Sequence, residues 1–172
     1  EKEGRLPDAI AACIGGGSNL IGAVHEFLDD KEVELHGVEP EHSAALTNGT
    51  VGIMQGFKSL MLQSSSGDAT LSTQSLASGI NFYSAGPEHA YLKQINRIKY
   101  SHVSDKEAFD AFQLICKTEG ILIAFEPAFA VAHGIKLAKE MGKEKILVLN
   151  ICGRGDKDID TAEKMLGDNL DK

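Results

Sequence analysis

The residues best suited to bind a charged ligand are gathered in Gly15-Gly16-Gly17-Ser18-Asn19, which follows the apolar run Ala9–Ile14. Successive glycines let backbone N–H groups approach an anion closely. A helix that begins at Ser18 or Asn19 would add unpaired N–H groups, and the hydroxyl and amide side chains add further donors. The segment matches neither the Walker loop nor the GxGxxG motif. It is interpreted either as a phosphate cradle or as a purely structural turn.

A second glycine-rich segment, Cys152–Asp158, follows the apolar run Lys145–Ile151. A turn with solvated charges is the favoured interpretation, and the alternative is that the Cys152 thiol faces a ligand at the end of a strand. Cys13 and Cys116 have apolar neighbours and are expected in the core. The three cysteines form no CxxC pair, which favours reduced thiols in a cytosolic protein.

Glu126 is the carboxylate whose role is most open, because it follows an apolar stretch and precedes Pro127. It is expected either at the surface or in a pocket that shifts its pKa. None of the histidines has the spacing of a metal-binding motif, and all are expected to be structural or exposed. The six are His25, His36, His42, His89, His102 and His133.

The spacing of apolar residues predicts short strands that alternate with helices. Strands are predicted over Ala9–Ile14, Glu34–Glu39, Val51–Met54, Ser59–Gln63, Tyr100–Val103 and Lys145–Ile151, the last as a continuous buried run. Helices are predicted over Leu20–Leu28, from Pro87, from Ser104 to near Gly120, over Phe129–Met141 and over Ile159–Leu166. The clearest boundary signals are a capping box at Ser104–Glu107 and the glycines Gly120 and Gly142.

Two stretches depart from this alternation. Ile121–Phe125 is predicted to be briefly extended, and Ala44–Ser84 to be an irregular excursion with an exposed turn at Gln63–Asp68. The alternation elsewhere predicts an α/β fold with three layers, in which a mainly parallel, twisted sheet is flanked by helices. Ligands bind such sheets outside the carboxyl ends of the strands, where both glycine-rich segments fall.

Length and composition restrict the class of protein. The 172 residues suit a single α/β domain over 1–172, and 42% of them are hydrophobic. A net charge of −8 disfavours nucleic acid and anionic membranes as partners. No apolar run reaches the length of a membrane span and no signal peptide is recognised, so a cytoplasmic location is expected. The absence of an initial methionine suggests that the chain is a piece of a longer protein.

Four motifs in order make the pattern specific. They are Glu3-Gly4-Arg5-Leu6-Pro7-Asp8, Gly15-Gly16-Gly17-Ser18-Asn19, Gly86-Pro87-Glu88-His89-Ala90-Tyr91-Leu92 and Gly153-Arg154-Gly155-Asp156-Lys157-Asp158. Together they resemble the C-terminal part of the tryptophan synthase beta subunit family, one of the fold-type II pyridoxal-phosphate enzymes. The resemblance runs from about Glu3 to Leu166. It implies that the cofactor is pyridoxal 5′-phosphate, which supplies the electron sink for the reaction.

The resemblance also assigns roles to individual residues. It implies that the loop 15–19, namely Gly15, Gly16, Gly17, Ser18 and Asn19, holds the cofactor phosphate and that Glu126 lies beside the cofactor ring. Cys152 stands where the family usually has a serine that hydrogen-bonds the pyridine nitrogen, and a neutral thiol is a weaker partner. The backbone carbonyls of Gly15, Phe82 and Ser84 match a site for a monovalent cation, Na⁺ or K⁺.

For the whole enzyme, the resemblance implies a β-replacement that condenses L-serine with indole to give L-tryptophan. The implied partners are these two substrates, the alpha subunit and a second beta subunit. The family's Schiff-base lysine lies in an N-terminal half that this chain does not contain, so the chain alone is expected to be inactive.

Several residues near the implied active site depart from the family pattern. Asn81 replaces an aspartate that helps hold the serine-derived intermediate, Tyr83 a proline, and Gln55 a histidine. Two alternatives therefore remain: a divergent pyridoxal-phosphate lyase that acts on another amino acid, and a non-catalytic phosphate-binding module.

Overall fold

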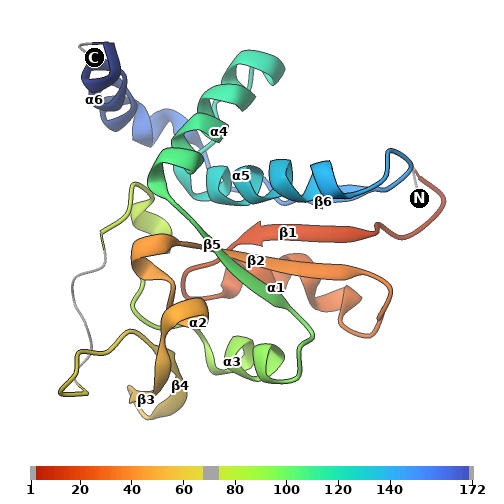
Figure 1. The fold of residues 1–172 in the computed structure, drawn as a ribbon, viewed down its shortest axis with the longest axis vertical. Coiled ribbons are helices and arrows are strands. Elements are labelled where there is room, and N and C mark those ends of the chain that lie inside the picture. The colour runs from red at the N-terminus through yellow and green to blue at the C-terminus, as the bar shows by residue number, and fades with distance from the viewer. Residues whose placement is uncertain (1–2, 68–73, 171–172) are drawn as a thin grey trace.

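Four parallel strands form the main sheet of the structure, a computed structural model that describes residues 3–67 and 74–170 (Figure 1). The strands are β1 (Ala9–Cys13), β2 (Glu34–Pro40), β5 (Lys99–Val103) and β6 (Leu147–Leu149), and their order is β5-β2-β1-β6. β1 lies in the middle and pairs with β2 on one side and β6 on the other. The parallel pairing predicted from the alternating pattern is confirmed.

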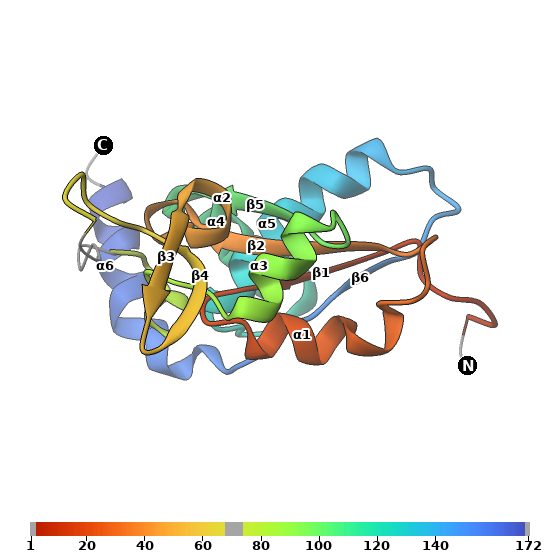
Figure 2. The same cartoon turned by 90° about the horizontal axis from the view of Figure 1, so that it is seen from below.

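Helices cover both faces of this sheet (Figures 1 and 2). α1 (Ser18–Val24) and α3 (Pro87–Gln94) lie on one side, and α4 (Asp105–Glu119) and α5 (Phe125–Glu140) lie on the other. α6 (Ile159–Leu170) packs near one end of α4 and α5. Short 3₁₀ turns occupy His25–Phe27, Glu41–Ser43, Ser78–Ile80 and Gly155–Asp158. The predicted three-layer α/β architecture is therefore confirmed.

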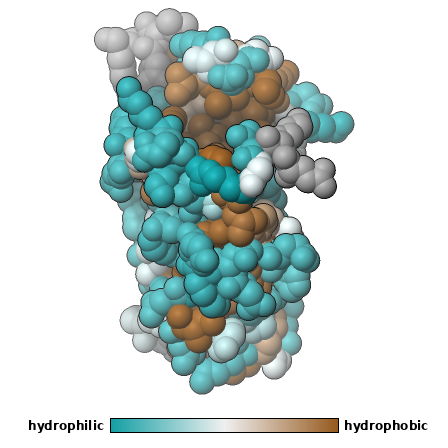
Figure 3. Space-filling view, turned by 90° about the vertical axis from the view of Figure 1, so that its right-hand side faces the viewer, coloured by the Kyte–Doolittle hydropathy of each residue, from teal (hydrophilic) through white to brown (hydrophobic). Residues whose placement is uncertain are grey.

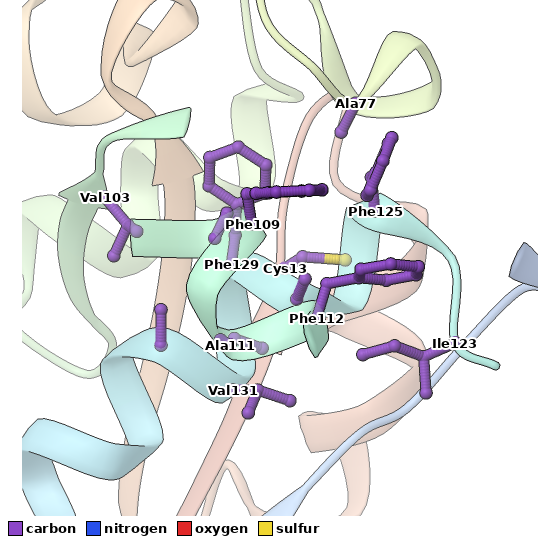
Figure 4. Packing of buried hydrophobic residues seen from close by; sticks show 14 of the residues in the cluster. Cys13, Ala77, Val103, Phe109, Ala111, Phe112, Ile123, Phe125, Phe129 and Val131 are labelled. Atoms are coloured by element: carbon purple, nitrogen blue, oxygen red, sulfur yellow. The ribbon is translucent and has the colours of Figure 1, made fainter. Parts of the chain in front are cut away.

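Alternate residues of β1 face opposite layers, which explains why its whole sequence is apolar. Ile10 and Ala12 pack in the cluster on the α1 side, whereas Cys13 belongs to the cluster on the α5 side. The second cluster is rich in aromatic rings: Phe112 and Phe125 pack edge to face with centroids 4.9 Å apart (Figure 4). Cys13 is fully buried as predicted, while Cys116 is only partly buried against the same cluster.

The boundaries of α4 follow from local chemistry. The Ser104 side chain accepts a hydrogen bond from the Glu107 N–H, and the Glu107 carboxylate accepts one from the Ser104 N–H, which completes the predicted capping box. Gly120 ends the helix with a φ of 68°, a left-handed conformation that favours glycine. α3 likewise begins with Pro87 in its first turn, as predicted.

The strand prediction over Lys145–Ile151 is wrong in its length and its burial. β6 has only three residues, and Val148 is 42% exposed. The reason is its place at the edge of the sheet, where β6 pairs only with β1 among the described strands. An apolar run of this kind indicates a strand but does not distinguish an edge position from a central one.

The prediction for the start of α5 is also wrong. The helix begins at Phe125, four residues before the predicted Phe129, and it includes Glu126 and Pro127 in its first turn. Proline is tolerated there because the first N–H groups of a helix have no partner within it. Residues 121–124 are part of no strand, although the Leu122 carbonyl accepts a hydrogen bond from the Gly155 N–H at 3.2 Å. α1 and α6 differ from prediction too, since α1 ends at Val24 before a 3₁₀ turn and α6 continues to Leu170.

The excursion predicted over Ala44–Ser84 is present and contains a hairpin apart from the main sheet. A short helix, α2 (Ala45–Asn48), precedes the antiparallel strands β3 (Thr50–Met54) and β4 (Phe57–Met61). Gln55 and Gly56 connect the strands with φ values of 47° and 88°, as in a type I′ turn. This tight turn starts the second strand two residues before the predicted Ser59. Part of the predicted turn at Gln63–Asp68 lies outside the described residues.

The connection between α1 and β2 is held by the side chain of Arg97. Its guanidinium group donates hydrogen bonds to four backbone carbonyls, those of Phe27, Leu28, Asp30 and Val33, at 2.6–3.1 Å. The Phe27 and Asp30 carbonyls also accept hydrogen bonds from the N–H groups of Asp30 and Val33, so the guanidinium group adds to the turns of the connection. The half-buried Arg97 side chain thus holds the backbone of this connection in place.

Among the described residues, no helix is long and apolar enough to cross a membrane. Exposed apolar side chains nevertheless gather on α4, α6 and the connection between α4 and α5: Leu114, Ile121, Leu122, Ile159 and Leu166. Figure 3 shows apolar surface at the corresponding end of the molecule. Nothing among the described residues covers this surface.

A chain of hydrogen bonds lies under α5, near the amino ends of the strands and beside a cavity of about 720 Å³. Glu34 Oε2 lies 3.2 Å from His36 Nε2, His36 Nδ1 lies 3.1 Å from His133 Nε2, and His133 Nδ1 lies 3.2 Å from the Ser101 hydroxyl. The Glu34 carboxylate only accepts, so His36 donates to it through Nε2, His133 Nε2 donates to His36 Nδ1, and the Ser101 hydroxyl donates to His133 Nδ1. Each imidazole thus carries one proton and is neutral. Burial lowers the pKa of His36, and burial together with the nearby His36 and Lys136 lowers that of His133 to about 4.

This pair predicts a loss of stability in acid. Both pKa values lie below the ordinary value of 6.5, so the unfolded chain binds more protons than the folded chain as the pH falls from 6.5 to about 4. The free energy of unfolding should fall by about 1–2 kcal/mol through this window. Urea denaturation at several pH values would measure it. His133→Gln should weaken the dependence of the unfolding free energy on pH, and the exposed control His102→Gln should not. An equal pH dependence in the native chain and both variants would contradict the prediction.

Candidate functional site

The two glycine-rich segments meet at the carboxyl edge of the main sheet. The loop 15–19 follows β1, and Cys152 follows β6. The chain leaves β1 toward β2 on one side, whereas β6 lies on the other side, so the strand order reverses between β1 and β6. A reversal of this kind opens a crevice outside the carboxyl ends of parallel strands, where ligands of α/β proteins bind.

The backbone of the glycine loop is fixed by the segment that follows the hairpin. The Gly86 N–H donates to the Gly16 carbonyl at 2.9 Å, and His89 Nε2 donates to the Gly17 carbonyl at 2.8 Å. A Cβ at Gly15 would lie 2.7 Å from Ile80 Cα. Gly17 has a φ of 125°, and a Cβ there would collide with the His89 ring. These two glycines are therefore required by the packing of the loop.

Gly16 differs from its neighbours because it faces open space. It is exposed, and a Cβ built on it would meet nothing within 4 Å. Within the part of the chain that the structure describes, the N–H groups of Gly15, Gly16, Gly17 and Ser18 have no protein acceptor. The exposed Ser18 hydroxyl lies on the same loop. Unpaired donors around an open space fit a phosphate group, so the phosphate-cradle interpretation is the one the geometry favours.

The Asn19 side chain performs a different task from the rest of the loop. Its Nδ2 donates to the Cys13 carbonyl at 2.9 Å and to Cys13 Sγ at 3.3 Å, and its Oδ1 accepts from Asn150 Nδ2 at 3.0 Å. The side chain thereby ties the end of β1 to the end of β6. Only the backbone of Asn19 remains available to a ligand.

Glu126 lies in a partly enclosed position in the first turn of α5. It is 9% exposed, and its Oε1 accepts a hydrogen bond from the Gly79 N–H at 2.9 Å. Lys157 Nζ lies 3.1 Å from Oε1 and 2.9 Å from Oε2. Burial raises the pKa of Glu126, but the hydrogen bonds from Lys157 and from the backbone outweigh it and hold the pKa below its ordinary value. Glu126 is therefore not a surface residue, and its shifted pKa agrees with the other interpretation.

Lys157 and Asp158 are site residues that the sequence analysis missed. Lys157 Nζ lies 2.7 Å from Asp158 Oδ1, and Asp158 Oδ2 accepts the first N–H of α5, that of Phe125, at 2.9 Å. The favoured interpretation of Cys152–Asp158 as a turn with solvated charges is therefore wrong for Asp158, which is 8% exposed, but not for the side chain of Lys157, which is 40% exposed. It holds for Arg154 and Asp156, whose side chains are 84% and 58% exposed. The missed signal was that two opposite charges follow a glycine turn and precede a helix.

Cys152 contacts Cys13 across the crevice, with the two sulfur atoms 3.7 Å apart. The hydrogen bond between the thiols lowers the pKa of Cys152, and that contact together with burial raises the pKa of Cys13. The more exposed thiol, Cys152, is thus the first to lose its proton. The alternative that Cys152 faces a ligand is compatible with its position, because it is only partly buried at the end of β6.

The segment Ser78–Ser84 forms another wall of the crevice. A Cβ at Gly79 would lie 2.6 Å from Glu126 Oε1, so a larger residue there would displace the carboxylate. Asn81 follows two residues later with its side-chain oxygen buried, and a Cβ at Gly15 would also meet the Phe82 ring at 2.8 Å. Ser84 pairs with Met61 of β4. The structure thus brings Gly15 and Phe82 together, while the cation site at Gly15, Phe82 and Ser84 stays a prediction.

The site as a whole combines an anion cradle, an ionised carboxylate and a pair of thiols along one edge of the sheet. In the described ranges, no group of three or more His, Cys, Asp or Glu side chains could hold a metal ion. The unpaired N–H groups of the loop 15–18 fit a phosphate group, and Cys152 follows the neighbouring strand β6 at the same edge of the sheet. The residues present therefore fit a phosphorylated ring cofactor.

Comparison with known proteins agrees with this geometry. Residues 1–153 match the family model described as pyridoxal-phosphate dependent enzyme. The chain is 49% identical to the tryptophan synthase beta chain of Mycobacterium leprae (strain TN) over 95% of its own length and 41% of that protein. It is 47% identical to the tryptophan synthase beta chain of Dinoroseobacter shibae, covering 99% of this chain and 43% of that one. The chain thus spans about two fifths of the length of these relatives.

Solved structures with a similar fold are more distant in sequence. A threonine deaminase from T.th. matches with a TM-score of 0.64 and 19% identity, over 89% of this chain and 46% of that one. An L-serine ammonia-lyase from the fungus Rhizomucor miehei matches with a TM-score of 0.66 and 21% identity, over 95% of this chain and 51% of that one. These structures support the fold, and the family model covers most of the chain. The chain belongs to the family of pyridoxal-phosphate dependent enzymes.

Proposed function

We propose that this chain is the phosphate-binding half of an enzyme that condenses L-serine with indole to give L-tryptophan. The observation that carries the proposal is the glycine loop, whose unpaired N–H groups surround the open space at Gly16. Identity of 47–49% to proteins named tryptophan synthase beta chain supports the choice of reaction.

In this proposal each part of the crevice holds one part of the cofactor. The N–H groups of residues 15–18 and the Ser18 hydroxyl bind its phosphate. Cys152 faces the ring nitrogen, and Glu126 lies beside the ring. Pyridoxal phosphate, when bound, supplies an electron sink for cleavage and formation of bonds at the amino acid.

Lys157 keeps Glu126 ionised and limits its motion. Two hydrogen bonds from the ammonium group and one from the Gly79 N–H fix the plane of the carboxylate. Asp158 holds the ammonium group from the other side. A fixed negative charge is a preorganised electrostatic element, which needs no rearrangement when charge develops on a substrate.

The proposal assigns the remaining parts of the active site to residues outside this chain. These are the lysine that forms the Schiff base and the loop that binds the substrate carboxylate. It therefore treats residues 1–172 as one α/β domain of a larger enzyme, cytoplasmic, with an alpha subunit and a second beta subunit as partners. A monovalent cation held by the carbonyls of Gly15, Phe82 and Ser84 belongs to the same proposal, as does a role for Asn81 in holding the amino-acid substrate.

Titration of the chain with pyridoxal phosphate and with inorganic phosphate tests the cradle. Both should bind, and Gly16→Ala should weaken binding about tenfold or more, because its methyl group would occupy the open space that the phosphate needs. The thermal midpoint without ligand should stay unchanged, since that Cβ meets nothing in the protein. Gly22→Ala, within α1 and equally free of contacts, is the matched control.

A folded chain that binds neither compound would show that the loop is structural. The reaction itself is tested separately, by joining the chain to its natural upstream sequence and measuring tryptophan formed from serine and indole. A protein that binds the cofactor but forms no tryptophan would instead favour a lyase that acts on another amino acid. The amide of Asn81, at a position where the family resemblance implies an aspartate, motivates that second candidate, and Asn81→Asp should then bring no gain in synthesis.

A further inference from the structure

We propose that Cys13 and Cys152 form an oxidisable dithiol, which a hydroperoxide converts into a disulfide at the ring end of the crevice. The proposal starts from their contact. The two residues are 139 positions apart in sequence, yet their sulfur atoms lie 3.7 Å apart. They stand at the carboxyl ends of β1 and β6, which pair directly in the sheet.

The surroundings allow the two sulfur atoms to close to bonding distance. A disulfide requires about 2.05 Å between sulfur atoms. Cys13 is the last residue of β1 and is held by Asn19, whereas Cys152 lies beyond the end of β6. Gly153 follows with a φ of 74°, and among the described residues a Cβ built on it would meet only the Ala124 methyl group within 4 Å. The closing motion is therefore assigned to Cys152 and the glycine turn.

The contact also gives the two thiols different roles. Asn19 Nδ2 donates to the Cys13 sulfur, which leaves the Cys13 S–H to donate to Cys152. That hydrogen bond favours the thiolate of Cys152, which is only partly buried, and it outweighs the opposing effects of burial and of the Glu126 charge on the pKa of Cys152. Cys152 is thus the attacking residue, and the buried Cys13 is the residue that completes the disulfide.

The chemistry is a two-electron oxidation in two displacements. The Cys152 thiolate attacks one oxygen of hydrogen peroxide, the O–O bond breaks, and the departing hydroxide takes up a proton to become water. Cys13 then attacks the sulfur of the resulting sulfenic acid, the S–O bond breaks, and the hydroxide leaves as water with the proton of Cys13. One peroxide and two thiols thus yield one disulfide and two molecules of water.

The consequence for the cofactor rests on the proposed function. A disulfide would pull Cys152 away from the position assigned to the ring nitrogen. A bound cofactor would in turn cover Cys152 and slow its oxidation. The chain would then be most sensitive to peroxide when its cofactor is absent.

The experiment is to treat the reduced chain with hydrogen peroxide, alkylate the remaining thiols and identify linked peptides by mass spectrometry. Free thiols should fall from three to one, with Cys13 linked to Cys152 and with Cys116 still free. Loss of the Cys152 thiol should be at least about tenfold faster than loss of Cys116. Cys13→Ser should stop the reaction at a sulfenic acid that dimedone traps, and Cys116→Ser should leave disulfide formation unchanged.

Three free thiols after treatment, a link between two chains, or sulfonic acid at Cys152 without a linked peptide would each overturn the proposal. The readout needs no cofactor, so it does not depend on whether the chain is part of a tryptophan-forming enzyme. A chain that binds pyridoxal phosphate but forms no disulfide overturns the dithiol alone. A chain that forms the disulfide but binds no pyridoxal phosphate overturns the proposed function alone.

Discussion

Replacing Lys157 with methionine is expected to lower the free energy of unfolding by about 2 kcal/mol. The substitution keeps most of the apolar stem but removes the charge between Glu126 and Asp158, whose side chains are only 11% and 10% exposed. Two carboxylates would then share an enclosed site without a counter-ion. Removal of one partner from a fully buried pair costs more, and the 40% exposure of Lys157 reduces the expected loss.

Arg154→Met is the matched control, because Arg154 belongs to the same turn but pairs with Asp156 at the surface. Its effect on the unfolding free energy should stay within about 0.5 kcal/mol. Urea denaturation measures both variants. Equal losses in the two would contradict the special role of Lys157.

The effect of Lys157→Met should depend on pH in a definite direction. In the native chain the pKa of Glu126 lies below its ordinary value of 4.5, so the stability that this carboxylate contributes is present above pH 4.5. It is lost as the pH falls below 4.5 and the carboxylate takes up a proton. The gap between the native chain and the variant should therefore narrow in acid, and a constant gap would mean that only packing was lost.

Gly17→Ala is expected to destabilise the chain by about 3 kcal/mol even without ligand. A φ of 125° is strained for alanine, and the new methyl group would collide with the His89 ring. Displacing that ring would break its hydrogen bonds to the Gly17 carbonyl and to the Tyr100 hydroxyl. Of the hydrogen bonds between the loop and the start of α3, the one from the Gly86 N–H to the Gly16 carbonyl would remain.

Thermal and urea denaturation of Gly17→Ala check this expectation beside Gly22→Ala. Gly22 is exposed in α1, and alanine there should raise stability by up to about 1 kcal/mol through helix propensity. A Gly17→Ala chain as stable as the native chain would show that His89 moves aside without cost. In that case glycine at position 17 would be needed for phosphate binding alone and not for stability.

Elements with strong local signals were predicted from the sequence. The Ser104–Glu107 capping box, Gly120 and Pro87 each act within a few residues, so their effects can be recognised without knowledge of the fold. The glycine loop was placed correctly for the same reason, since an apolar strand, a run of glycines and a helix follow one another directly. Its position in the sheet then followed from the rule for parallel strands.

Features that depend on distant partners were not predicted. β6 is short because of its edge position, which only the strand order reveals. The start of α5 at Phe125 depends on Asp158, which lies 33 residues later and accepts the first N–H. The contact between Cys13 and Cys152 joins residues 139 positions apart. Such pairings are decided by packing across layers, and the spacing of residues along the chain carries no record of them.

The hydrogen bonds of Arg97 affect which substitutions the connection between α1 and β2 can accept. Arg97 binds only main-chain carbonyls, so it holds the connection at 27–33 whatever side chains are present there. The exposed side chains of Asp29 and Glu32 can therefore be replaced without loss of these hydrogen bonds. Lysine could not replace Arg97, because a single ammonium group lacks the planar fork that reaches four acceptors. One arginine thus fixes the backbone of the connection, so its exposed positions are open to substitution while the core still constrains Phe27, Leu28 and Val33.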